Sequence, residues 1–106
     1  MTINNIRIHL IERDAGITKV DGQVWESGFW VISESNAQKL INGSIFFHKK
    51  LKEPSFFGGI IQNYRIQEDG AHSGSVIFKF EYQADHRNIK AENRGWSNEI
   101  KIVLDK

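Results

Sequence analysis

The sequence predicts one mainly β domain of the α+β class, with six or so strands and one short helix in a strongly curved sheet or partly closed barrel. The chain has 106 residues, 40% of them hydrophobic and 25% charged, which suits one soluble domain over residues 1–106. Its apolar residues gather in short segments rich in β-branched and aromatic side chains. One segment has the pattern of a helix. So many short strands leave exposed edges unless the sheet curves or closes.

Two strand patterns precede the helix, and a long connection joins them. Apolar and polar residues alternate over residues 6–10, which predicts a strand with one face inward. Residues 12–27 show little periodicity, so we expect a long connection with a short strand near 17–20. The apolar run Gly-Phe-Trp-Val-Ile at 28–32 predicts a short, heavily buried strand.

A short helix is the clearest local prediction. Residues 33–38 offer two N-caps, and Ser35 with Gln38 has the spacing of a capping box. Apolar residues then recur on one side of the segment. Gly43 accepts the left-handed conformation that ends a helix, and a strand follows over 44–48.

The second half alternates strands with polar loops. Residues 76–82 give the most regular alternation in the chain. The adjacent glycines 58 and 59 indicate a bulge or a close approach to the backbone. We expect strands at 60–66, 76–82 and 100–104, and loops at 49–57, 68–74 and 84–98.

The composition excludes several classes of protein. The absence of cysteine removes disulfides, thiolate nucleophiles and cysteine-based zinc sites. No apolar run approaches the roughly 20 residues of a membrane-spanning helix. Residues 1–5 lack the basic and apolar regions of a signal peptide. We therefore expect a cytoplasmic protein with no cofactor and no membrane contact.

The four histidines do not predict a metal site, because no two have the spacing of a helical His-Glu-x-x-His pair. His72 and His86 are interpreted as exposed loop residues. His48 ends a predicted strand, where it either donates to a phosphate or a base or lies half-buried.

Two segments concentrate basic residues although the net charge is only +1. Such segments are either ordinary solvated loops or contacts for phosphate groups, which need several cations acting together. The candidate phosphate-binding residues are Lys49 and Lys50 in the first segment and Arg87, Lys90 and Arg94 in the second.

Four segments in the middle of the chain follow a recognisable order. They are GFWVI at 28–32, AQKL at 37–40, NGSIFFH at 42–48 and FGGII at 57–61. This order resembles the opening of PUA-like domains, a superfamily that includes the PUA, ASCH, EVE and YTH branches. The resemblance covers about residues 25–83. It implies a PUA-like pseudobarrel of about six strands, with one short helix after the second strand, that binds RNA or DNA. Resemblance to the EVE and YTH branches further implies binding of modified bases.

Aromatic residues supply candidates for a base-binding pocket. Stacking on an aromatic ring contributes roughly 1–3 kcal/mol per base, and a flipped base also needs polar groups at its edge. The alternative is that these rings fill the core. The candidates are Trp25, Trp30, Trp96 and Phe56 for stacking or lining, with Ser27 and His48 as polar readers.

We therefore expect a nucleic-acid-binding domain, with two alternatives from other classes. One is a protein-interaction module or inhibitor, either monomeric or a homodimer, that uses an exposed aromatic patch. The other is a small ASCH-like amidohydrolase of modified nucleosides that uses Lys49 or Lys50 with Glu99. No motif in the chain assigns a catalytic residue.

Overall fold

The structure is a computed structural model that describes residues 6–12, 16–97 and 99–104. Strands dominate it, so the protein is mainly β, as the sequence predicts. The elements are β1 (Arg7–Ile11), β2 (Ile17–Asp21), β3 (Val24–Trp30), α1 (Glu34–Leu40), β4 (Ser44–His48), β5 (Phe57–Ile66), β6 (Val76–Tyr82), the 3-10 turn η1 (Ala84–His86) and β7 (Ile100–Val103).

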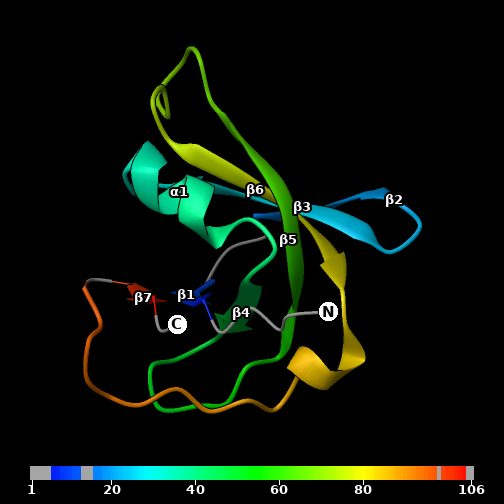
Figure 1. Cartoon of the computed structure of the whole chain (residues 1–106), viewed down its shortest axis with the longest axis vertical. Helices are drawn as coiled ribbons and strands as arrows, with labels where there is room; N and C mark the ends of the chain where they lie inside the picture. The colour runs from blue at the N-terminus through cyan, green and yellow to red at the C-terminus, as the bar shows by residue number, and fades with distance from the viewer. Residues whose placement is uncertain (1–5, 13–15, 98, 105–106) are drawn as a thin grey trace.

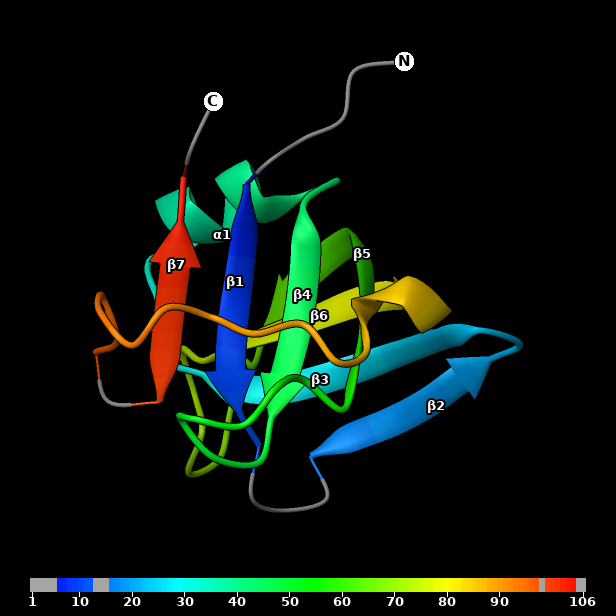
Figure 2. The same cartoon turned by 90° about the horizontal axis from the view of Figure 1, so that it is seen from below.

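All the described strands belong to one mixed sheet with the order β2-β3-β6-β5-β4-β1-β7. β1 and β4 are parallel, with Ile8 opposite Ile45, and the other neighbouring pairs are antiparallel. The sheet bends so strongly that β7, β1 and β4 lie below β3 and β6 in Figure 1 and cross in front of them in Figure 2. β2 and β7 remain at its two edges, so the sheet is curved but does not close into a barrel.

β5 joins the two halves of the sheet because it is long enough to pair with both. Its first residues pair with β4, and its later residues pair with β6 as far as Ile66 opposite Val76. The register with β6 shifts between Ile61 and Asn63, which accommodates the bend. The core lies inside the curve, where α1 contributes two of its buried side chains. The fully buried apolar residues are Ile8, Leu10, Ala37, Leu40, Ile45, Phe47, Ile61, Val76, Phe78 and Phe80.

Gly58 and Gly59 lie where β5 runs closest to both neighbouring strands. A Cβ atom on Gly58 would lie 2.3 Å from the carbonyl oxygen of Ile45, and one on Gly59 would lie 1.9 Å from that of Glu81. The two glycines therefore permit a close approach of backbones. The register shift expected at this pair lies further along β5.

Two features of the first half differ from the sequence prediction. The sheet has seven strands where six or so were expected, and α1 follows the third strand instead of the second, because the short strand expected near 17–20 forms and pairs with β3. β3 also begins at Val24, earlier than predicted, and ends at Trp30. Val31, which was expected inside a buried strand, is 84% exposed.

The ends of α1 also differ in detail. Ser33 is the N-cap, since its hydroxyl accepts the N–H of Asn36 at 3.1 Å, so the capping box at Ser35 is wrong. Past the other end, Asn42 takes the left-handed conformation, with φ of 70°. Gly43 is required for another reason: a Cβ atom there would lie 2.5 Å from the carbonyl oxygen of Ile6.

Replacing Gly59 by alanine tests the close approach of β5 and β6. We expect the free energy of unfolding to fall by about 2–3 kcal/mol, because the added methyl group forces the strands apart. Urea denaturation measures the change, and Gln62→Ala, at an exposed position of β5, is the control. A Gly59→Ala variant as stable as the control would show that the strands are not so close.

Candidate functional site

Residues 84–97, which we call the arm, cross the outward face of β4, β1 and β7 as the orange segment of Figure 2. At its start the His86 ring stacks on Phe46, with centroids 4.8 Å apart, and its Nε2 lies 3.0 Å from the hydroxyl of Ser44. The Asp85 carboxylate lies 2.7 Å from the other ring nitrogen. The His86 side chain is only 12% exposed, so its assignment as an exposed loop residue is wrong.

The far end of the arm is attached to β7. The Lys101 ammonium donates to the carbonyl oxygen of Glu92 at 3.1 Å and also to that of Arg94. The indole N–H of Trp96 donates to the same Glu92 carbonyl at 3.1 Å. Lys101 is 8% exposed, and a charge so buried needs such oxygen partners. The arm therefore lies against the sheet at both ends.

Aromatic rings fill part of the space between the arm and the sheet. The His9 ring stacks on Phe46, with centroids 4.7 Å apart and planes 15° from parallel. Trp96 lies 6.3 Å from the His9 ring and packs edge-on against His48 at 5.8 Å. As a result His9 is 2% exposed and His48 is fully buried. The outward face of the sheet is a second, partly polar interior.

The hydrogen bonds of the two buried histidines determine where their protons are. His48 Nδ1 lies 2.8 Å from the carbonyl oxygen of Glu53, which only accepts, so Nδ1 carries the proton. In the neutral ring His48 Nε2 is then an acceptor. It lies 2.9 Å from His9 Nδ1, which must donate to it. The remaining nitrogen, His9 Nε2, therefore has an unprotonated lone pair.

Burial keeps both rings neutral. Burial lowers the pKa of His9 to about 3, reinforced by repulsion from His48 when that ring is protonated and by the positive charges of Arg7 and Lys101. Burial also lowers the pKa of His48, although its hydrogen bond to the Glu53 carbonyl acts in the opposite direction. Both rings are neutral near pH 7, as the proton positions derived above require.

A cleft of about 540 Å³, which we call the basic cleft, opens between the arm and strands β1 and β7 beside His9. Four cationic side chains line it against one carboxylate. The Arg94 and Glu92 side chains approach to 3.9 Å, but both are largely exposed, so their mutual neutralisation is weak. The charged residues of the lining are Arg7, Lys90, Arg94, Lys101 and Glu92.

Ser55 links the arm to the loop of residues 49–56. Its backbone N–H donates to the Ile89 carbonyl at 2.9 Å, and its carbonyl accepts the N–H of Asn88 at 2.7 Å. Its hydroxyl donates to the His86 carbonyl at 2.6 Å and accepts the N–H of Ile89 at 3.0 Å. The two segments run side by side at the lower edge of Figure 1.

This link joins the two basic segments of the sequence into one surface, which we call the basic strip. The loop 49–56 and the arm contain six Lys or Arg against three Asp or Glu, a net charge of +3. The whole chain has a net charge of +1, so the remaining residues sum to −2. The positive charge is thus local, and bulk composition conceals it. The exposed cations of the strip are Lys49, Lys50, Lys52, Arg87, Lys90 and Arg94.

A second cavity, of about 400 Å³, lies on the other side of β7, between that strand and the segment that precedes α1. We call it the β7 pocket. Gly95 and Ile102 line both this pocket and the basic cleft, so the two adjoin. Its walls combine apolar and polar side chains: Val31, Ile32, Ile100 and Ile102, with Ser33, Asn36 and Ser97.

The structure does not bring the three tryptophans into one pocket. Trp30 is 9% exposed in the core, where its indole N–H donates to the fully buried Ser27 hydroxyl at 2.9 Å. Trp25 is half-buried on β3 and packs edge-on against Phe57 at 5.2 Å. Only Trp96 lies beside the basic cleft. A base cannot reach Trp30 or Ser27 without opening the core.

The other predicted base-binding residues also have structural partners. Phe56 is half-buried under the ammonium of Lys49, which lies 4.7 Å from its ring centroid. His48 is fully buried, and its Nε2 accepts a hydrogen bond from His9. Lys49 and Glu99, the pair named for a hydrolase, lie at the same end of β1, next to His48 and Ile100.

The sequence did not predict Arg7, His9, Lys101 or Ser55 as site residues. Strand alternation is the one sequence pattern that bears on the first two. Alternation in 6–10 places Arg7 and His9 on the polar face of β1, but it does not say that the arm covers this face. Lys101 has the same parity on β7, opposite His9. Ser55 is a single serine in a loop, and nothing in the sequence distinguishes it.

Comparisons with protein-family models, curated proteins and solved structures returned no match. In the described part of the chain, no helix is long and apolar enough to cross a membrane. Within the same residues, no three His, Asp or Glu side chains are placed to hold a metal ion. The function is therefore inferred from the geometry of the site.

Replacing Ser55 by alanine removes its hydroxyl and leaves the backbone bonds in place. We expect the free energy of unfolding to fall by about 1–3 kcal/mol, because the part-buried N–H of Ile89 loses its acceptor. Amide hydrogen exchange at Ile89 should also accelerate. The control is Ser73→Ala in an exposed turn, and equal exchange at Ile89 in both variants would contradict the role of Ser55.

The lowered pKa values predict that stability decreases as the solution is acidified. Below about pH 6.5 these histidines bind protons in the unfolded chain but not in the folded chain. The free energy of unfolding therefore falls with falling pH. Between pH 7 and pH 5.5 we expect a loss of about 1–2 kcal/mol in urea denaturation. His9→Gln should reduce this pH dependence, whereas His72→Gln, at an exposed position, should retain it. Equal slopes in both variants would show that His9 titrates normally.

Proposed function

We propose that this protein binds single-stranded nucleic acid, with phosphates along the basic strip and in the basic cleft. The observation that carries the proposal is the Ser55 link, which combines two basic segments into one surface of net charge +3. Sequence-independent affinity for nucleic acid arises from several cations acting together on phosphates. The strip and the cleft share Lys90 and Arg94, so they form one continuous path.

The β7 pocket is the proposed place for a base. Its volume lies within the roughly 300–1,000 Å³ typical of ligand pockets. Apolar side chains on β7 supply a surface for the base, and Ser33, Asn36 and Ser97 supply polar groups for its edge. Because the pocket adjoins the basic cleft at Gly95 and Ile102, a base in the pocket keeps its phosphate near Arg94 and Lys101. A modified base is one class of ligand for this pocket.

We also propose that the chain is a divergent PUA-like domain. The supporting observations are the succession of β3, α1 and β4 and the strong curvature of the sheet. The open edges at β2 and β7 are where the chain departs from a closed pseudobarrel.

Neutralising the shared cations tests the proposal. The double variant Lys90→Ala/Arg94→Ala should weaken binding of single strands of about 12 nucleotides, and each lost phosphate contact should reduce the slope of log K against log salt by about 0.7. Fluorescence anisotropy measures both between about 50 and 200 mM salt.

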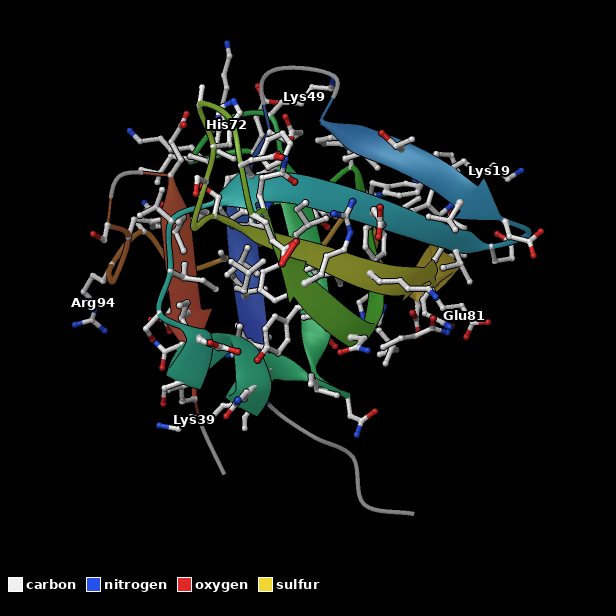
Figure 3. All side chains as sticks on the ribbon, turned by 90° about the horizontal axis from the view of Figure 1, so that it is seen from above. Lys19, Lys39, Lys49, His72, Glu81 and Arg94 are labelled. Carbon is white, nitrogen blue, oxygen red and sulfur yellow. The ribbon has the colours of Figure 1, made fainter. Side chains whose placement is uncertain are left out.

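The control is Lys39→Ala/Lys79→Ala, which removes the same charge from α1 and β6. Figure 3 shows Lys39 on the opposite side of the molecule from Lys49. Equal binding by both double variants would show that the basic strip does not bind the phosphates. A wild-type chain that binds no strand at low salt would overturn it. That result would leave the protein-interaction alternative, which the 44% exposure of Phe29 and the exposed Val31 favour.

A further inference from the structure

Among the side chains that line the basic cleft, His9 is the one uncharged acceptor beside several cations. The cations around it belong to β1, β7 and the arm: Arg7, Lys101, Lys90 and Arg94. Lysine and arginine side chains only donate hydrogen bonds. His9 also lines this cleft, and its Nε2 is the ring nitrogen that the chain from Glu53 through His48 leaves without a proton.

His9 lines the basic cleft, although only 2% of the residue is exposed. In the described residues, every fully buried side-chain nitrogen or oxygen has a hydrogen-bond partner. His9 Nδ1 has His48 as its partner, and no contact within the described chain occupies Nε2. Nε2 is therefore not fully buried, and it is the nitrogen of His9 that can accept a hydrogen bond from a ligand in the cleft.

We propose that His9 Nε2 accepts a hydrogen bond from the 2′-hydroxyl of a ribose, so that the protein binds RNA in preference to DNA. The inference rests on the proposed function, because it specifies which sugar, ribose or deoxyribose, is preferred in the strand that the basic cleft binds. A phosphodiester anion carries no donor of its own. RNA places a hydroxyl donor on the sugar beside each phosphate, and DNA does not.

The surroundings of His9 make it suitable for this discrimination. A protonated histidine would donate to phosphate and attract RNA and DNA alike. The positive charges of Arg7 and Lys101 and the burial of the ring oppose protonation, so the acceptor persists across the physiological range. Stacking on Phe46 and the bond to His48 hold the ring in one orientation, which directs its lone pair at a defined point.

The first test compares three strands of one sequence on the wild-type chain: RNA, DNA and 2′-O-methyl RNA, which keeps the sugar oxygen but has no donor. We expect RNA to bind about three- to tenfold more tightly than the other two, as for one added hydrogen bond. Equal affinity for RNA and DNA would overturn this inference and leave the proposed function intact. Tight binding of 2′-O-methyl RNA would overturn it as well. Binding of none of the three would instead overturn the proposed function.

The second test uses variants on the protein side. His9→Leu should equalise the affinities for RNA and DNA, whereas His9→Gln, which keeps an acceptor near the same place, should retain part of the preference. The matched control is His72→Leu, at an exposed histidine that stacks on Phe29 outside the cleft. Thermal unfolding establishes whether each variant folds. If His9→Leu does not fold, the comparison of the three strands on the wild-type chain decides. A folded His9→Leu chain that still prefers RNA would overturn the assignment to His9.

Discussion

The hydrogen bonds of Ser55 are the interaction on which the candidate site depends. The serine uses its backbone N–H, its carbonyl and its hydroxyl to join two loops that are more than thirty residues apart in the chain. Ordering a loop has an entropic cost for every residue, and one buried serine offsets part of it for both loops. Because the loops are held together, their positive charges act as one surface and the arm lies over the sheet.

The arm gives the outward face of β1, β4 and β7 an interior of its own. This interior is partly polar, so its groups must find partners among themselves. His9, His48 and the Glu53 carbonyl do so in a chain with only one consistent arrangement of protons, and Lys101 does so by donating to arm carbonyls. The packing that stabilises the arm thus also leaves a neutral acceptor in a cationic cleft.

The site was harder to predict than the strands because its residues come from distant segments. Alternation assigned His9 to the polar face of its strand, and the composition identified both basic segments. Neither observation says that the two segments meet, or that a polar face is covered. The tryptophans were instead assigned to a site that the structure does not form. They were singled out for their stacking surface, yet Trp30 belongs to the core. The hydroxyl of Ser27, three residues earlier on β3, accepts its indole N–H there.

Local patterns of apolar and polar residues were enough to predict the class of the fold and most of its strands. Residues 76–82 form β6 with the predicted bounds, because regular alternation of apolar and polar side chains suits a strand with one face buried. The start of β3, the cap of α1 and the number of strands depended on pairing and on competing caps. Only the tertiary structure decided that β1 lies parallel to β4, that the arm covers both and that Ser55 joins two basic loops. These are contacts between residues far apart in the chain, and local propensity carries no information about them.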